Sequence, residues 1–395
     1  VASQKNKERI ISLNDFDYPV EGIVAHFLCA LRKYANELKD TPLDKQGVTI
    51  TVPAKSEVIQ RMTMRFAAKV AGFNGQIDLL EEPVAAFLYH RHIHPNAFKL
   101  KDNKLAYALV IDMGGGTSDL AVVEYESKKL PRVIGRAMAR FGGEDIDKLF
   151  LETFWLQSYK SPYKTEPEPR LLNHSQLKRM NEGRRALLYA YVRTAKEALS
   201  NGLNSYIQDV TGAIPGRSGL IKAPQVFAED LRALLKNKEL TASYPNDRGK
   251  PHTLSVENHL AKLIDMALQD AKIKRHEIHK LIFAGGSIRL PGIRDLVIDF
   301  FTSDKRPGTP HRGFSEATDI HDKSPEACVA GGAAIHQLYR HHKNKKWRKV
   351  IEPTLSSEYK LVHYRNNSGE EKFEQLGKAK QTLPINRITY PKALT

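Results

Sequence analysis

A glycine-rich turn between two apolar runs carries the clearest chemistry in this sequence. The turn Gly114 to Thr117 (Gly-Gly-Gly-Thr) follows ALVIDM and precedes DLAVVEY. Glycines in such a turn let several backbone N–H groups converge on an anion, as in phosphate-binding nests. Asp112 and Asp119 bracket the turn, where carboxylates suit the water shell of a phosphate-bound Mg²⁺. The alternative is a plain hairpin with two solvated aspartates, but hairpins favour two-residue turns, so we expect a phosphate site.

Two more glycine pairs lie in turns that can approach the same ligand. Residues 142–144 (Gly-Gly-Glu) leave room for backbone contact with ribose or phosphate, although a simple strand-end turn is the alternative. Residues 285–287 (Gly-Gly-Ser) are expected to open a helix, whose N–H groups and dipole suit an α-phosphate or ribose. Arg289 is either a platform that stacks on a base or an ordinary surface arginine.

The strand-turn-strand arrangement differs from the P-loop, which places Gly-Lys-Ser/Thr before a helix. Together with four other segments in the same order, it resembles the ATPase domain of heat-shock protein 70 (DnaK-type) chaperones. The five segments, which lie within residues 19–338, are VTITVPAKSEVIQR, LLEEPVAAFLY, DMGGGTSDLAVVE, RFGGEDIDKLF and KLIFAGGSIRLPGIRDLVIDFF. The resemblance implies an α/β, actin-like ATPase fold with two lobes of mixed β-sheet flanked by helices.

The resemblance also implies ATP or ADP with Mg²⁺ as the ligand and gives roles to individual residues. Glu82 would orient the attacking water or support the metal shell, whereas a Glu beside Pro is, taken alone, an ordinary helix-start carboxylate. Asp112, Asp119 and Thr117 would complete the catalytic set, and the two aspartates would hold the metal through water. The implied nucleotide-binding residues are Gly114, Gly115, Gly116, Thr117, Gly142, Gly143, Glu144, Lys196, Ser200, Gly285, Gly286, Ser287, Arg289 and Glu326.

The sequence departs from the family pattern in three places. The first phosphate hairpin and the catalytic lysine of the family do not occur upstream of Gly47, so we expect an N-terminally incomplete fold. Arg193 stands where the family has Glu, and Glu197 stands at a frequently basic position. Glu326 replaces an Asp but keeps the carboxylate. We therefore expect weak or no ATP hydrolysis by this chain alone, unless the missing phosphate motif is supplied.

The implied function is that of an ATP-binding, stress-response chaperone of the heat-shock protein 70 type, in which nucleotide state controls lobe closure. Its partners would be unfolded client polypeptides and a co-chaperone or nucleotide exchange factor. A catalytically degenerate nucleotide-binding scaffold or regulatory protein is the alternative. A filament-forming actin-like ATPase is less favoured, and a sugar kinase of the same fold stays open.

Alternating strands and helices must position these residues. We expect helices over 19–38, 56–71, 176–199, 227–235, 256–271 and 328–338, another from about 291, and strands over 47–54, 76–80, 105–113, 119–125 and 280–284. We expect a remainder of lobe I at 1–101 and lobe II at 102–340, with an inserted subdomain at about 144–252. Residues 341–395 would form a linker and a short C-terminal β-type tail, in which YKLVHY and RITYP suggest strands.

Composition limits the other possibilities. The net charge of +16 makes a nucleic-acid partner possible, but basic residues are spread along the chain and cluster only at 340–349, where a linker is expected. No apolar run has the ~18 residues of a membrane span. Cys29 and Cys328 lie in small, apolar surroundings, which favours buried, reduced thiols and a cytoplasmic location. His90, His92 and His94 fit a polar helix exit better than a metal site, because no cysteine or carboxylate completes the set.

Overall fold

The computed structural model describes residues 10–13, 16–37, 47–54, 56, 58–100, 104–126, 131–154, 174–202, 226–245, 249–305, 310, 313–341, 359–365 and 371–377. The chain divides into two compact units. The first comprises Val1–Leu105, Val123–Ile134 and Cys328–Thr395, and the second comprises Ala106–Val122 and Gly135–Ala327. No helix in the described part of the chain is both long and apolar enough to cross a membrane.

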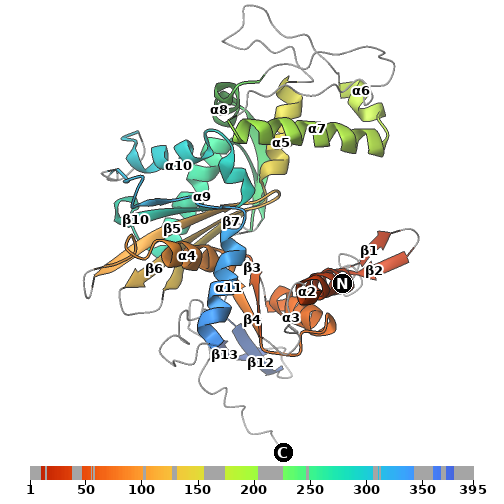
Figure 1. The fold of residues 1–395 in the computed structure, drawn as a ribbon, viewed down its shortest axis with the longest axis vertical. Helices are drawn as coiled ribbons and strands as arrows, with labels where there is room; N and C mark the ends of the chain where they lie inside the picture. Colours follow the sequence, from red (N-terminus) through yellow and green to blue (C-terminus); the bar gives the residue numbers. More distant parts are fainter. Residues whose placement is uncertain are drawn as a thin grey trace, which may run out of the picture. The chain divides into compact units, whose positions relative to one another are not determined.

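A five-stranded sheet with the order β11-β10-β5-β6-β7 lies mostly in the second unit, whereas the end of β6 and the start of β7 belong to the first. Its strands are β5 (Leu105–Met113), β6 (Ser118–Glu126), β7 (Arg132–Ala139), β10 (Ile278–Ala284) and β11 (Ile320–His321). Strands β5, β6, β7 and β10 are labelled in Figure 1. Strand β10 pairs in parallel with both β5 and β11, which requires long crossover connections. Most of β5 and β6 is buried, as expected for central strands covered on both faces.

Helices and a second hairpin complete this unit. They are α5 (Gly143–Phe154), α6 (His174–Arg179), α7 (Glu182–Ser200), α8 (Ala228–Asn237), β8 (Glu239–Tyr244), β9 (Lys250–Ser255), α9 (Val256–Ala271), η4 (Arg275–Glu277), η5 (Gly286–Arg289) and α10 (Ile293–Thr302). Helix α9 lies directly against β7, because Gly135 has no Cβ where one would come within 2.3 Å of the Ala267 carbonyl oxygen. The Arg136 N–H, which donates to Asp270 Oδ2 at 2.9 Å, joins the same two elements.

Three element predictions in this unit need correction. The helix expected over 176–199 is two helices, because the Asn181 side chain accepts a hydrogen bond from the Arg184 N–H and begins α7 anew. The sequence predicts no strand between 125 and 280, whereas the structure has the β8–β9 hairpin there. The helix expected to open at residues 285–287 is only the four-residue 3₁₀ helix η5, whereas the separate helix expected from about 291 is present as α10, which begins at Ile293.

The first unit contains a two-stranded parallel sheet between helices. Its elements are β1 (Ile10–Leu13), β2 (Phe16–Pro19), α2 (Val20–Glu37), β3 (Val48–Val52), α3 (Val58–Val70), β4 (Ile77–Glu81), α4 (Glu82–Ile93), α11 (Cys328–His341), β12 (Tyr359–Arg365) and β13 (Glu371–Gly377). Strand β12 confirms the prediction for YKLVHY, whereas RITYP lies outside the described residues.

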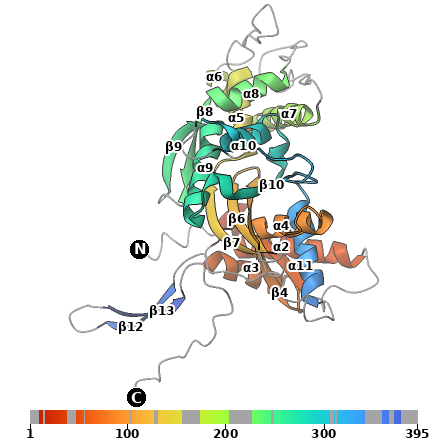
Figure 2. The ribbon, with the colours of Figure 1, turned by 90° about the vertical axis from the view of Figure 1, so that its left-hand side faces the viewer.

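Alternate residues of β3 face different helices. Val48 and Ile50 pack on an apolar cluster formed by α2, α3 and Phe73. Thr49 points the other way, where its hydroxyl donates to Gln337 Oε1 of α11 at 2.8 Å. Helix α11 approaches α4 so closely that a Cβ on Gly332 would lie 1.7 Å from the Ala85 carbonyl oxygen, and the two helices lie side by side in Figures 1 and 2.

The two cysteines differ in burial, and His90, His92 and His94 differ in their neighbours. Both cysteines are free; Cys328 is buried and Cys29 is half-buried, so only Cys328 is as enclosed as expected. The rings of His90 and His94 stack with centroids 6.4 Å apart, whereas His92 Nδ1 lies 3.0 Å from the Tyr339 hydroxyl. The three histidines therefore do not converge on one point.

Candidate functional site

The glycine turn joins the ends of β5 and β6 in the second unit. The Gly114 N–H donates to the Thr117 carbonyl oxygen at 2.9 Å and closes the turn. Gly115, Gly116 and Thr117 are exposed, and a Cβ on Gly116 would meet no atom within 4 Å. The tip of the hairpin therefore presents backbone to an open space, which is the arrangement that the sequence predicts for an anion-binding turn.

The start of α5 docks onto this turn through its backbone. The Gly143 N–H donates to the Gly114 carbonyl oxygen at 2.9 Å, and the Glu144 N–H donates to that of Gly115 at 2.8 Å. Gly142 permits the contact, because a Cβ there would lie 2.5 Å from the Gly115 carbonyl oxygen. The glycine pair thus has a packing role in joining α5 to the hairpin, besides any contact with a ligand.

The two aspartates of the hairpin lie in strongly desolvated positions. Burial raises the pKa of Asp112 to about 6. Burial also raises the pKa of Asp119 to about 7; the hydrogen bond from Thr117 opposes this rise, and the charge of Asp112 adds to it. Asp119 Oδ1 is buried and has no hydrogen-bond partner among the described residues. An acceptor in this position fits a ligand that brings its own donor, such as the hydration shell of a cation.

Helix α7 presents a polar face formed by residues spaced three and four apart. Lys196 is buried, and its ammonium donates to the Gly143 carbonyl oxygen at 2.7 Å and forms an ion pair with Asp147 Oδ1 of α5 at 2.5 Å. Arg193 Nε lies 3.7 Å from the other oxygen of Asp147. The Ser200 hydroxyl donates back to the Lys196 carbonyl oxygen at 3.2 Å. A buried carboxylate on α5 therefore fixes the position of Lys196.

The short helix η5 provides the opposite wall. The Ser287 hydroxyl donates to the Gly114 carbonyl oxygen at 2.8 Å, so η5 is also tied to the turn. Gly285, with φ +82°, lets the chain pass close to Met113, because a Cβ on Gly285 would lie 2.3 Å from the Met113 carbonyl oxygen. Arg289 forms a two-point ion pair with Glu326, in which Nη2 donates to Oε2 at 3.0 Å. Desolvation would raise the pKa of Glu326, but Arg289 outweighs it and lowers that pKa.

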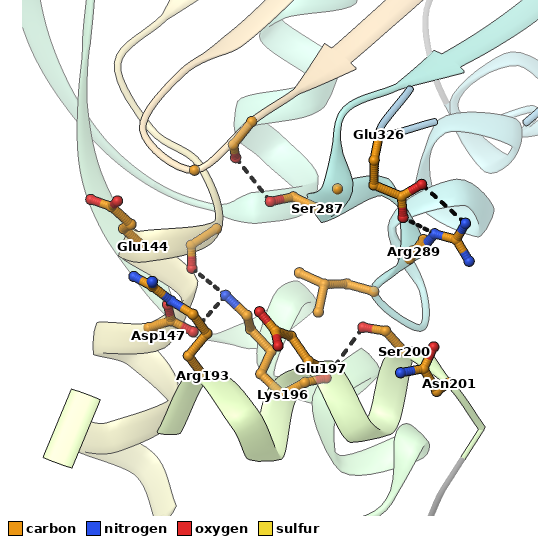
Figure 3. A pocket seen from close by; sticks show the side chains of 15 residues that line it. Glu144, Asp147, Arg193, Lys196, Glu197, Ser200, Asn201, Ser287, Arg289 and Glu326 are labelled. Atoms are coloured by element: carbon orange, nitrogen blue, oxygen red, sulfur yellow. Dashed lines mark hydrogen bonds and ion pairs between the residues drawn. The ribbon is translucent and has the colours of Figure 1, made fainter. Parts of the chain in front are cut away.

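These walls enclose a cavity of about 490 Å³, a size typical of small-molecule and cofactor sites. Figure 3 shows Arg193, Lys196 and Asp147 gathered on one side, and Arg289 paired with Glu326 on the other. The lining residues are Gly114, Gly115, Gly143, Glu144, Asp147, Arg193, Lys196, Glu197, Ser200, Asn201, Gly286, Ser287, Arg289, Leu290 and Glu326.

Ten of the seventeen residues selected from the sequence line this cavity, and seven do not. Gly116, Thr117, Gly142, Gly285, Asp112 and Asp119 belong to the same turns but do not line the cavity. Glu82 is the first residue of α4 in the first unit, where it is half-buried.

Sequence reasoning missed Asp147, Asn201 and Leu290 among the lining residues. Asp147 follows Gly143 by four residues and so lies on the same face of α5 one turn later, which is a signal that helical spacing could have supplied. Asn201 is the C-cap of α7, and Leu290 follows η5.

Comparison with known proteins places this arrangement in a family. The family model described as "Hsp70 protein" matches residues 1–205 and 254–336. The chaperone protein DnaK of Mycoplasmopsis agalactiae is 29% identical over 83% of the chain and 46% of its own length. An HscA homolog of Methylibium petroleiphilum is 29% identical over 81% of the chain and 41% of its own length.

The chain thus spans less than half the length of these two relatives. The resemblance predicted from the five motifs is confirmed, and with it the actin-like ATPase fold. The chain belongs to the Hsp70 family.

Proposed function

We propose that this chain binds ATP and ADP with Mg²⁺ in the cavity of the second unit, as the nucleotide-binding part of an Hsp70-type chaperone. The observation that carries the proposal is the convergence of three elements on one glycine turn. Helix α5, η5 and, through Gly143, Lys196 of α7 are all attached to residues 114–115 by hydrogen bonds. A ligand held by that turn would therefore contact all four segments at once.

Each part of the cavity has a proposed role. The N–H groups of the exposed turn bind phosphate oxygens, and the hydroxyl of Thr117 lies at the same tip. Asp112 and Asp119 hold the metal through water, which would satisfy the orphan oxygen of Asp119. When bound, the magnesium nucleotide supplies the phosphoanhydride bond to be hydrolysed and the cation that neutralises its charge.

The residues farther from the turn are assigned to ribose and base. The ion pair with Asp147 fixes the position of the Lys196 ammonium, so the protein sets the direction in which the ammonium can donate a further hydrogen bond to a ligand. The guanidinium of Arg289, which is held by its ion pair with Glu326, offers a planar surface on which the base could stack. Ser200 donates to backbone and keeps its oxygen as an acceptor.

Isothermal titration calorimetry with Mg-ADP and Mg-ATP tests binding. We expect saturable binding by the chain and at least a roughly tenfold loss in Asp119→Asn, which corresponds to about 1.4 kcal/mol. Asp304→Asn, which makes the same change at an exposed aspartate of this unit, should bind like the parent. Absence of binding to the parent chain, or equal binding by both variants, would contradict the proposed site.

Hydrolysis, client binding and lobe closure belong to the same proposal and rest on family membership. Glu82 is assigned to orient the attacking water. Under conditions in which the parent chain releases phosphate from ATP, Glu82→Gln should therefore lower that release and leave nucleotide affinity unchanged. The proposed lobes, 1–101 and 102–340, remain predictions. Unfolded polypeptides and a nucleotide exchange factor are the proposed partners.

A catalytically degenerate scaffold is the second candidate, and one observation favours it. Arg193 and Glu197 both line the cavity with charges opposite to the family pattern expected from the sequence. Such a site can hold a nucleotide as a structural or regulatory ligand without turning it over. Nucleotide binding without phosphate release, even when a family nucleotide exchange factor and client are added, would favour the scaffold over the chaperone.

A further inference from the structure

Helix α3 of the first unit carries an exposed apolar stripe. Ile59, Met62, Phe66 and Val70, here called the α3 stripe, are 53%, 65%, 60% and 61% exposed. They recur at spacings of three, four and four residues, so they lie along one side of the helix. The opposite side, with Ala67 and Ala68, is buried, and Ala68 belongs to the cluster against β3. The stripe is therefore additional to the face that holds α3 in its own fold.

Scattered apolar side chains are common on protein surfaces, but an aligned set of large ones marks a contact surface. The neighbouring helix α2 strengthens this interpretation, because Phe27, Leu31 and Tyr34 form a second exposed row on it. The two helices are fastened to each other, since Arg32 Nε donates to the Ala71 carbonyl oxygen at 2.8 Å. Both helices thus expose a row of apolar side chains, and this hydrogen bond holds the two helices together.

Charge lies on one flank of the α3 stripe only. Arg65 and Lys69 each precede a stripe residue by one position, are exposed and have no ion-pair partner among the described residues. On the other flank, Gln60 and Thr63 are uncharged. Helix α3 contains no acidic residue, and its remaining cation, Arg61, is already bound to Glu81 at 3.1 Å.

We propose that the α3 stripe is a docking surface for an amphipathic helix of a protein partner, whose apolar stripe is flanked on one side by Asp or Glu. The stripe spacing matches helix-to-helix packing, in which one row of side chains fits between the rows of the other helix. The acidic flank of the partner would face Arg65 and Lys69 and would fix its direction. This surface is independent of the proposed nucleotide site.

Two other occupants fit the observations less well. A second copy of the chain, docked antiparallel through the same face, would bring the two basic flanks against each other. A bilayer would favour basic residues on both sides of an apolar face, as in helices that lie in the membrane interface. The one-sided charge of α3 instead suits a partner of defined orientation.

Fluorescence anisotropy with two labelled peptides tests the proposal on the full chain. The acidic peptide is a designed helix of about four turns with a leucine stripe and Glu on one flank, and the basic peptide carries Lys at the same positions. We expect the acidic peptide to bind and the basic one not to. Met62→Gln/Phe66→Gln and Arg65→Glu/Lys69→Glu should each weaken binding roughly tenfold or more.

The charge-reversed variant should gain affinity for the basic peptide, which a general loss of folding cannot produce. Leu187→Gln, at an exposed leucine of α7, is the matched control and should behave like the parent. Circular dichroism checks that each variant is folded. Equal binding of both peptides, or binding of neither, would overturn the proposal. The proposal would also be overturned if the chain bound phosphatidylserine vesicles but not the acidic peptide. It would be overturned as well if sedimentation showed self-association of the chain that Met62→Gln/Phe66→Gln abolishes.

Discussion

Burial of the Asp119 side chain disfavours the ionised form of its carboxyl group. Its carboxyl pKa is raised to about 7 in the folded chain, chiefly by desolvation, from an ordinary value of 3.8. The folded state therefore binds more protons than the unfolded state between these values, and stability falls as pH rises through this window. At pH 8, an ionised Asp119 destabilises the fold by roughly 4 kcal/mol at most.

Asp119→Asn should consequently raise the free energy of unfolding at pH 8 and leave it almost unchanged below about pH 3, where the carboxyl is protonated in both states. Urea denaturation at the two pH values measures the difference. Asp304→Asn, at an exposed carboxyl, should have little effect at either pH. A destabilising effect of Asp119→Asn at pH 8 would mean that the carboxylate is satisfied by groups other than those described.

The raised pKa values of Asp112 and Asp119 predict that magnesium-assisted nucleotide binding depends on pH. Asp112, with a pKa of about 6, and Asp119, with a pKa of about 7, must lose their protons before they can hold the waters of Mg²⁺. The magnesium-dependent part of ADP affinity should therefore rise from pH 5.5 to pH 8. Calorimetric titrations with Mg²⁺ and with EDTA at each pH isolate this part. A flat profile would exclude both groups from the metal site.

The candidate site residues could be predicted from the sequence where one short segment contains all of the residues that come together. Asp112 and Asp119 flank the turn because the two strands and the glycines are contiguous, so no tertiary knowledge is needed. The ion pair between Asp147 and Lys196 could not be predicted in the same way, because Lys196 comes from a helix that begins dozens of residues later. Pairing across helices depends on packing, which local patterns do not contain.

At the scale of elements, the docking of α5 on the β5–β6 turn depends on missing side chains. Gly142→Ala should destabilise the second unit and weaken nucleotide binding, because the new Cβ would lie 2.5–2.6 Å from the carbonyl oxygens of Gly114 and Gly115. Overpacking of this kind typically costs about 1–3 kcal/mol. Thermal unfolding and calorimetry measure the two effects.

Gly116→Ala is the matched control from the same turn system. A Cβ on Gly116 would meet no atom within 4 Å, so this variant should keep the stability of the parent. If both variants destabilise the chain equally, backbone conformation rather than close approach is the reason for the glycines.

Element prediction succeeded where hydrophobic periodicity was strong and failed where local capping decided the outcome. Helix α9 matches the prediction over 256–271, since its apolar residues recur throughout and Ser255 caps its start. The expected helix over 176–199 is divided at Asn181, where a side-chain oxygen satisfies a backbone donor and restarts the helix. The β8–β9 hairpin was missed because His252 and its neighbours are polar and half-exposed, without clear alternation.

At the scale of the whole molecule, the strand order was beyond the reach of sequence patterns. Strand β10 lies between β5 and β11, although more than a hundred residues separate it from β5. Alternating strands and helices predict a sheet flanked by helices but not which strands are neighbours. The family resemblance predicted two lobes of mixed sheet flanked by helices, but not the order of these strands.

Nucleotide binding should change the chain's amide exchange in a pattern that separates binding from lobe closure. With Mg-ADP, hydrogen–deuterium exchange should slow at residues 114–117, 142–144 and 286–289, because a ligand would cover or rigidify these backbone donors. Peptides that cover the start of α4, at Glu82, belong to the other unit. Protection there as well is expected if nucleotide closes the two lobes around itself. It should weaken in Gly142→Ala, in which nucleotide binding is weakened, but persist in Asp304→Asn. Protection confined to the second unit would support a nucleotide-holding scaffold, and no protection at the three turns would contradict the site itself.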